Sequence, residues 1–577
     1  MVSYTMFVNA CPMTSDERTV DRRSFLKAAG GAAVTAAVAG CTDDSGGGDR
    51  QSATGTYTVS SVGGPFLQTV EVDGEGPLVY ARGDHPQNYD PQQTTSGEVA
   101  KVTNQIFDQL IQFEPGSGGQ LAAGLATEYE LEGTTASLTL REGVTFHDGS
   151  DLTATDVRAS IRRFTDSGYD FYLGDENRSG YGPFTFGNWV ASVDDSQDGA
   201  VTIELQQEYA PFLRNLAMFA AAILSADQIQ GQGATPDDQA ALGTAPAGTG
   251  AFELAEIDNS NQRLRLTAND DYWGDGPQMD EVVFKTIKDN QTRTQDVIDG
   301  ASHITDNLDS QSSQQLQSND SAQLLGKNGI NVGYMAMNMA RYEPFRDRRV
   351  RRAVSFAVDT EAIVNSIYEG FATQASQPLP PDVFGHDDDL EPYETDKEQA
   401  QSLLEDADQT GLEFELATFS NPRGYNPSPV QTAQQVKSDL EELDAVDGVI
   451  INRFSTFTPY LEYTAQGRHD ACFLGWYTDN ADPDNFLYVL LDSKVDIEDV
   501  PEGQDWVDFD TEGYSTLNVS GWANTEYMET VREAQGTLDQ DEREQMYMEA
   551  NRIAREEAPW VFVDYAETLR GVNETVQ

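Results

Sequence analysis

Short apolar strands alternate with amphipathic helices along most of this 577-residue chain. In the helical stretches apolar residues return every three or four positions, as at Val157, Ile161 and Phe164. That spacing marks one face of a helix, whereas the strand-like stretches alternate apolar and polar residues. Such elements pack in layers, so the alternation predicts an α/β fold, and the length predicts more than one domain.

The predicted elements share this patterning. The strands are expected at 77–81, 138–141, 201–205, 263–267, 281–287, 449–454, 470–474 and 560–565, and the helices at 99–110, 153–164, 348–358, 399–407, 432–443 and 541–557. The segments 378–393 and 498–513 are rich in Asp, Gly and Pro, so we expect them in surface loops.

The first forty residues have the composition of an export signal. Arg22 and Arg23 precede a short run of Ala, Gly and Val that is too brief to span a bilayer. The paired arginines resemble the twin-arginine (Tat) signal, which exports folded proteins. Residues 38–41 read VAGC and resemble a lipobox, whose cysteine is lipidated and becomes the mature N-terminus.

We therefore expect a signal peptide with a lipobox over 1–40, translated from Met1 or Met13, and a flexible tether over 41–72. The mature protein is expected outside the cytoplasm. It would be held on the outer face of the cell membrane by the lipid on Cys41 alone.

Acidic residues dominate the charge, with 97 Asp and Glu against 36 Lys and Arg and a net charge of −61. This balance excludes nucleic acid as a partner, because nucleic-acid binding needs basic surface. Hydrophobic residues still make up 38%, which is enough for a core. Acid spread over a folded chain with little Lys is typical of proteins adapted to high salt, where repulsion between carboxylates is screened. We expect a halophilic source, such as a halophilic archaeon.

The sequence gives no positive sign of catalysis, cofactor binding or metal binding. It lacks phosphate-binding, nucleophile-elbow and zinc-protease motifs, and its five histidines stand singly. We expect His147 to play a structural role in a turn. The one cysteine beyond the lipobox, Cys472, lies in an apolar stretch and is expected to be a buried small hydrophobe.

Ordered motifs between residues 78 and 572 resemble one family, the extracytoplasmic solute-binding proteins of ABC importers that take up peptides and nickel. The segments that carry the resemblance are 121–127 (LAAGLAT), 140–149 (LREGVTFHDG) with 152–157 (LTATDV), 248–252 (GTGAF), 269–273 (NDDYW) and 344–353 (PFRDRRVRRA). The resemblance implies a two-lobed periplasmic-binding-protein clamp of type II, with a small extra subdomain in the first lobe and ligand buried between the lobes.

The implied first lobe spans 73–330 plus 545–577 and includes the subdomain at about 111–240. The implied second lobe spans 331–544.

Three further motifs are similar to those of dipeptide-binding members. Thr95, Ser96 and Gly97 match a pocket loop, residues 421–427 (NPRGYNP) a second loop, and 475–486 (GWYTDNADPDNF) a third. The resemblance gives Arg423 the ligand carboxylate and Asp479 the ligand amine. The other implied binding residues are Tyr425, Phe457, Trp476 and Tyr477, with Phe457 standing where the dipeptide binders carry Trp.

Physical chemistry supports these two roles. A dipeptide is a zwitterion whose charged ends lie a fixed distance apart, so a buried carboxylate and a buried guanidinium can each pair one end. A ligand of another length leaves one of these charges unpaired, which is costly. Peptide length is then selected by the spacing of charges, while varied side chains are tolerated.

Each residue also has a plainer interpretation. Asp479 could only start a turn, Arg423 could be an ordinary loop cation, and Trp476 and Tyr477 could pack on their own lobe. Asp482, before Pro483, is expected to be structural as a helix N-cap.

The sequence thus predicts a non-enzymatic, lipid-anchored receptor that delivers dipeptides or short oligopeptides to an ABC permease with a separate ATPase. The alternatives are a member of the same family that binds nickel, a glycoside or another solute, and a secreted lipoprotein hydrolase that uses two carboxylates.

Overall fold

The computed structural model describes residues 54–60, 67–73, 76–114, 119–173, 181–231, 240–277 and 279–576. The expected signal peptide, its lipobox and Cys41 lie outside these residues. Within the segment expected to be a tether, β1 and β2 pair as an antiparallel hairpin from Thr54↔Asp73 to Ser60↔Leu67. This pairing contradicts the prediction of a flexible tether for that part of the segment.

The strands are β1 (Thr54–Ser60), β2 (Leu67–Asp73), β3 (Leu78–Arg82), β4 (Ile111–Phe113), β5 (Leu121–Ala123), β6 (Ala126–Glu132), β7 (Thr135–Leu140), β8 (Val190–Asp194), β9 (Ala200–Leu205), β10 (Phe252–Asp258), β11 (Arg263–Ala268), β12 (Glu281–Thr286), β13 (Ile304–Thr305), β14 (Ala322–Asn328), β15 (Asn331–Met337), β16 (Ala372–Gln374), β17 (Leu412–Phe419), β18 (Val446–Phe454), β19 (Ala471–Tyr477) and β20 (Trp560–Asn573).

The α-helices are α1 (Gly97–Ile106), α2 (Ala154–Thr165), α3 (Phe212–Asn215), α4 (Ala226–Gln230), α6 (Asn290–Ile298), α7 (Ser310–Gln317), α8 (Arg348–Ala357), α9 (Thr360–Ala362), α10 (Lys397–Asp406), α11 (Pro429–Leu440), α12 (Phe457–Ala465), α13 (Asp484–Leu491), α14 (Thr525–Gly536) and α15 (Gln540–Glu557). Short 3-10 and π segments lie at Pro91–Gln93, Pro183–Gly187, Phe219–Ala221, Ala240–Gly243, Glu343–Arg346, Ile363–Ile367 and Ile497–Asp499.

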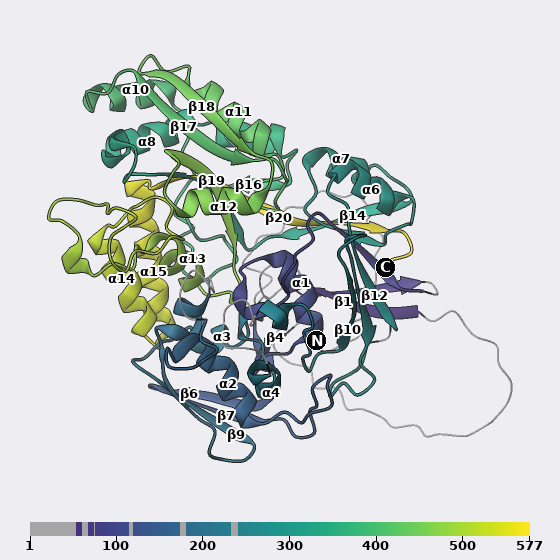
Figure 1. The fold of residues 1–577 in the computed structure, drawn as a ribbon. Helices are drawn as coiled ribbons and strands as arrows, with labels where there is room; N and C mark the ends of the chain where they lie inside the picture. The colour runs from purple at the N-terminus through teal and green to yellow at the C-terminus, as the bar shows by residue number, and fades with distance from the viewer. Residues whose placement is uncertain are drawn as a thin grey trace, which may run out of the picture.

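One twelve-stranded sheet runs through both lobes in the order β10-β11-β12-β3-β13-β20-β15-β19-β17-β18, with β14 and β16 also paired to β20. We call the half from β10 to β13, with β14, the first lobe, and the half from β15 to β18, with β16, the second lobe. Figure 1 shows the green second lobe above the purple, teal and blue remainder of the molecule. This arrangement confirms the predicted two-lobed α/β clamp.

The long strand β20 joins the two halves. Its first part pairs with β15 and β16, and its last part pairs with β13 and β14. At the crossover the Asn331 side chain donates to the Ala566 carbonyl at 2.8 Å and accepts from the Ala566 amide at 3.0 Å. The predicted strand 560–565 is thus only the second-lobe part of β20. The predicted lobe boundaries stay a prediction.

A small subdomain is formed by the antiparallel sheet β6-β7-β9-β8 and helix α2. A capping box opens α2, because Thr153 and Asp156 exchange hydrogen bonds between their side chains and backbone amides. The helix buries Val157, Ile161 and Phe164 as its apolar spacing predicts. The extra subdomain implied by the resemblance is therefore part of the fold.

The sequence patterning located these elements well, with ends shifted by a few residues, but both loop predictions were partly wrong. Segments 378–393 and 498–513 do not lie wholly on the surface, because Leu379, Val383, Val500 and Val507 are buried in the main core. Their Asp, Gly and Pro content indicated a turn-rich path, but burial depended on packing against other parts of the chain.

Buried polar groups also behave as expected where they are structural. Cys472 is fully buried, and burial raises the pKa of its thiol. His147 Nε2 contacts the Gly250 carbonyl at 2.9 Å, and its Nδ1 accepts from the Gly248 amide at 3.2 Å. His147 therefore ties the turn after β7 to the segment before β10.

A buried ion pair fixes the segment that leads to Thr95–Gly97. Arg163 of α2 donates to Asp90 at 2.7 Å and to the Gln92 side chain at 2.7 Å, and both charged side chains are 0% exposed. Asp90 also caps the short helix at Pro91–Gln93. Removing one member of such a pair leaves the other charge buried without compensation.

We predict that Arg163→Met lowers the free energy of unfolding by about 3–5 kcal/mol. The matched control is Arg158→Met on the same helix. Arg158 is 44% exposed and pairs with Asp195, so its loss should cost less than about 1 kcal/mol. Urea unfolding at constant salt measures both, and equal losses would contradict this account.

Candidate functional site

Three neighbouring parallel strands of the second lobe end at one edge of the sheet. Strand β17 pairs in parallel with both β18 and β19, and Phe419 lies opposite Phe454 at the ends of β17 and β18. The loops that follow these strands therefore emerge together. In open α/β sheets, ligands bind beyond the carboxyl ends of the strands.

The predicted ligand-binding residues of the second lobe lie at this edge. Arg423 and Tyr425 follow β17, Phe457 begins the helix after β18, and Asp479 follows β19. Trp476 and Tyr477 are the last two residues of β19. The fold thus brings together residues that lie up to 56 positions apart in the sequence.

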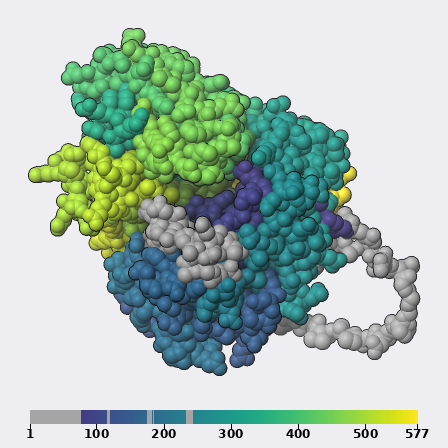
Figure 2. Space-filling view, in the orientation of Figure 1, coloured from purple at the N-terminus to yellow at the C-terminus, as the bar shows by residue number. Residues whose placement is uncertain are grey.

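The first lobe meets this edge with the ends of its own parallel strands. Strands β12, β3 and β13 are parallel, Asp84 follows β3, and Asp306 follows β13. Asp84 Oδ2 lies 3.3 Å from Arg423 Nη2, so this ion pair joins the two lobes. In the space-filling view the green second lobe lies over the purple and teal first lobe (Figure 2).

The Arg423 guanidinium is held in place, but one of its hydrogen-bond donors has no partner among the described residues. It lies over the Phe457 ring, 3.9 Å from the centroid, and its side chain is 16% exposed. Backbone hydrogen bonds of 3.0 and 2.9 Å between Arg423 and Asn426 fix the loop. Its Nε is buried and has no hydrogen-bond partner among the described residues. This donor is available to an acceptor brought by a ligand.

Asp479 is the buried carboxyl of the site. Its backbone amide donates to Asn485 Oδ1 at 3.1 Å, and the same oxygen accepts from Trp476 Nε1 at 2.8 Å. The hydroxyl of Tyr181, from the segment between α2 and β8, donates to Asp479 Oδ2. Burial raises the pKa of Asp479 to about 7, and the Tyr181 hydrogen bond partly offsets that rise.

Aromatic side chains build a wall between these two groups. Tyr425 is buried, with ring centroids 6.5 Å from Phe419 and 6.1 Å from Tyr477. Trp476 is half-buried and meets Tyr181 edge-on, with centroids 6.3 Å apart. Phe457 both supports Arg423 and packs edge-on against Phe419. Trp476 thus contacts a residue from outside the second lobe and does not pack solely on its own lobe.

Thr95 and Ser96 are exposed, and Gly97 opens α1. The Ser96 backbone carbonyl accepts from Val99 and Ala100, but its side chain does not cap the helix. The structure records no hydrogen bond between this segment and Arg423 or Asp479. Its place in a ligand site stays a prediction.

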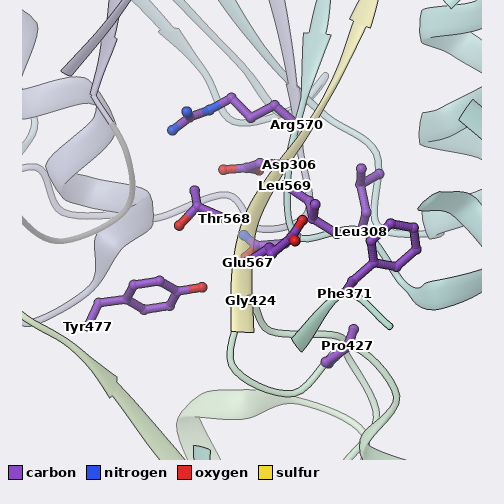
Figure 3. A pocket seen from close by; sticks show the side chains of 11 residues that line it. Asp306, Leu308, Phe371, Gly424, Pro427, Tyr477, Glu567, Thr568, Leu569 and Arg570 are labelled. Atoms are coloured by element: carbon purple, nitrogen blue, oxygen red, sulfur yellow. The ribbon is translucent and has the colours of Figure 1, made fainter. Parts of the chain in front are cut away.

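A pocket lies beside these residues, between the two lobes. It is lined by Asp306, Asn307 and Leu308 of the first lobe, Phe371, Gly424, Pro427 and Tyr477 of the second, and Glu567 to Arg570 of β20. Figure 3 shows Tyr477, Thr568 and Arg570 on one side of β20 and Phe371 and Leu308 on the other. Gly424 and Tyr477 link this pocket to the loop that carries Arg423.

Sequence reasoning missed the first lobe's contributions to this site. Asp84 could have been suspected because it directly follows a predicted strand, but 97 acidic residues make single carboxylates uninformative. Tyr181 and the β20 residues gave no signal, because only the folded chain brings them to the second lobe.

Asp482 has a structural role, as predicted, although the N-cap residue of α13 is Pro483 and not Asp482. It pairs with Arg543 at 2.9 Å inside the protein and accepts from the Asp484 amide at 3.1 Å. Asp484 in turn accepts from Tyr209 at 2.9 Å and Gln535 at 2.7 Å. These bonds anchor the start of α13, just after Asp479, to α14, α15 and the Tyr209 segment.

Comparison with known proteins identifies the family. The profile described as "Bacterial extracellular solute-binding proteins, family 5 Middle" matches residues 120–496. The chain belongs to this family. Its members are non-catalytic binding proteins, and the chain is the solute-binding protein of an ABC importer, acting outside the cytoplasm.

Individual relatives share about a quarter of their residues with the chain. The dipeptide-binding protein of Escherichia coli is 27% identical over 523 residues, covering 87% of this chain and 91% of that protein. Heme-binding protein A of Haemophilus influenzae is 27% identical over 503 residues, covering 85% and 87%. The crystal structure of a dipeptide-binding protein from Pseudoalteromonas sp. SM9913 with Met-Leu superposes with a TM-score of 0.76 at 26% identity, covering 86% and 96%.

The described residues contain no group of three or more His, Cys, Asp or Glu side chains placed to hold a metal ion. They also contain no helix with the length and hydrophobicity of a membrane span.

A glycine in β19 is required by the aromatic wall. A Cβ on Gly475 would overlap the Tyr425 ring and lie 2.7 Å from the Val332 carbonyl. We predict that Gly475→Ala displaces Tyr425 and lowers the free energy of unfolding by about 1–3 kcal/mol through overpacking. Urea unfolding measures the loss.

Gly448→Ala in neighbouring β18 is the control for Gly475→Ala. The nearest atoms to its added Cβ are 3.8 Å away, so its stability should stay within about 0.5 kcal/mol of the parent. A Gly475→Ala protein as stable as the Gly448→Ala protein would show that the wall tolerates displacement.

Proposed function

We propose that the chain captures dipeptides or short oligopeptides between its lobes and delivers them to an ABC permease whose ATPase is a separate chain. One observation carries the proposal: the Arg423 guanidinium, with its free Nε donor, and the buried Asp479 carboxyl emerge from the same edge of one sheet. The names of the dipeptide-binding relatives and the Met-Leu complex support it.

The chemistry of a peptide fits these two groups. The ligand carboxylate accepts from Arg423, whose planar guanidinium can donate two parallel hydrogen bonds. The ligand ammonium pairs with Asp479, which ionises on binding. Both charges are then compensated inside the protein, which a neutral or single-charged solute of the same size does not achieve.

Binding is coupled to lobe closure. A ligand that contacts both lobes favours the closed form over open ones, which is a shift of population. The crossover at Ala566 in β20 and the β14–β15 connection join the lobes, so bending there changes the gap between the two strand edges. The closed form is the one that docks on the permease.

The remaining parts of the proposal concern the setting of the protein. We propose that Cys41 carries a lipid that holds it on the outer face of the membrane after twin-arginine export. We also propose that its acidic surface, with a net charge of −61, is adapted to high salt. Mass spectrometry of the mature N-terminus tests the lipid, and unfolding across a salt series tests the adaptation.

A second candidate is another solute within the same family. The heme-binding relative covers the chain almost as fully as the dipeptide-binding one. Mass spectrometry of small molecules released by denaturing the purified protein distinguishes the two. Peptides support our proposal, whereas heme or a metal complex contradicts it.

We predict that Arg423→Met and Asp479→Asn each weaken dipeptide binding about tenfold or more, because each removes a charge-assisted hydrogen bond. Calorimetry with a free, an N-acetylated and a C-amidated dipeptide measures this. Blocking the amine should no longer matter in Asp479→Asn, and blocking the carboxylate should no longer matter in Arg423→Met. Asp166→Asn, on the exposed Arg162–Asp166 pair of α2, is the control and should bind like the parent.

We predict that dipeptide affinity rises with pH between about 5 and 7 and then levels off. The pKa of Asp479 is about 7 in the free protein, so below that pH the carboxyl must lose a proton before it can pair with an ammonium. Affinity then falls up to tenfold for each unit of pH. It also falls above about pH 8, where the peptide amine loses its proton. Calorimetry should show a flat profile from pH 5 to 7 for Asp479→Asn, and a flat parent profile would contradict the assignment.

A further inference from the structure

Both proposed anchor groups of the second lobe are already engaged by side chains from outside that lobe. Asp84 lies on Arg423, at 3.3 Å. Tyr181 donates its hydroxyl hydrogen to Asp479. One contact presents a carboxylate to the guanidinium, and the other presents a donor to the carboxyl. These are the two kinds of group that a peptide would bring with its own ends.

Asp84 is placed so that a ligand carboxylate can displace it from Arg423. It directly follows β3, is 41% exposed, and its contact with Arg423 uses only one guanidinium nitrogen. The buried Nε of Arg423 stays without a partner in the described part of the chain. A ligand carboxylate that takes both nitrogens therefore makes a better contact than Asp84 does.

Tyr181 is placed more firmly. Its ring is buried and meets Phe219 edge-on at 5.6 Å and Trp476 at 6.3 Å between centroids. Asp479 has its amide fixed by Asn485 at 3.1 Å. The hydroxyl and the carboxyl are thus held together by packing on both sides. A ligand ammonium must take the place of a neutral donor at a buried carboxyl, and the charged bond is the stronger one.

We propose that Asp84 and Tyr181 determine affinity and specificity in this cleft by holding the places of the ligand carboxylate and ammonium until a peptide displaces them. The inference rests on the proposed peptide-binding function. The measured binding free energy is then the difference between the free energy of the peptide's contacts and the free energy of the two contacts that the peptide replaces. A peptide with a blocked end cannot make the better contact at that end, so the resident side chain stays and the ligand is rejected.

The same two contacts hold the lobes together without ligand. The contact of Asp84 with Arg423 joins the first lobe to the second, and the contact of Tyr181 with Asp479 joins the segment between α2 and β8 to the second lobe. Their loss shifts the ligand-free population toward open forms. Small-angle scattering of the ligand-free protein measures this shift directly and needs no peptide.

The test uses Asp84→Asn, Tyr181→Phe and the double variant, with Asp166→Asn as control. Asp166 has a side chain 40% exposed in an ion pair remote from Arg423, which matches the exposure of Asp84. Tyr181→Phe keeps the ring and removes only the hydroxyl. Calorimetry compares a free dipeptide with its C-amidated and N-acetylated forms, and scattering gives the radius of gyration with and without free dipeptide.

We expect Asp84→Asn to bind the free dipeptide about two- to fivefold more tightly, the range for release of a partly exposed ion pair. Its affinity for the C-amidated form should not rise, so the preference for a free carboxylate widens. Tyr181→Phe should widen the preference for a free amine in the same way. The double variant should have a larger radius of gyration without ligand, and the free dipeptide should restore the parent value.

Equal or weaker binding of the free dipeptide by Asp84→Asn, while the parent binds it, would overturn this inference and leave the peptide proposal standing. If the parent binds no dipeptide, the peptide proposal fails. The scattering comparison then still decides whether Asp84 and Tyr181 hold the lobes together, because an unchanged radius in the double variant contradicts that role.

Discussion

The two lobes depend on one continuous strand. β20 completes the second-lobe half of the sheet with its first residues and the first-lobe half with its last. Where it passes from one to the other, the Asn331 amide satisfies both the N–H and the C=O of Ala566. A backbone group buried without a partner is costly, so this side chain substitutes for a neighbouring strand at the change of register. Motion of the lobes must therefore bend a paired strand.

The site follows from that arrangement. Because the two half-sheets are joined through β20, the carboxyl ends of β17, β18 and β19 face those of β3 and β13 across the crossover. Charged loops from both edges meet there, and the buried Asp306 and Arg570 line the adjoining pocket. Aromatic side chains pack around both anchor groups, with Phe457 under Arg423 and Tyr181 against Trp476 beside Asp479.

The sequence was informative where local pattern or motif determines position. Helical spacing placed Val157, Ile161 and Phe164 in the core, and a motif placed Arg423 and Asp479 in neighbouring loops. It was uninformative where position depends on contacts between distant segments. Neither Asp84 nor Tyr181 lies near its partner in sequence, and the burial of Leu379 in a turn-rich segment depends on the packing of other elements. Because the chain has 97 acidic residues, the sequence did not distinguish Asp84 from the others.

The central place of β20 also governs how the chain can fold. The strand lies between β13 and β15, yet it begins only at Trp560, near the end of the chain. During synthesis the two half-sheets cannot be joined until β20 has been made, and until then the edges of β13 and β15 are open to pairing with other chains. Long-range pairing of this kind is slow to form. Joining of the two half-sheets therefore depends on β20, and a chain without that strand would lack the central strand that both half-sheets share.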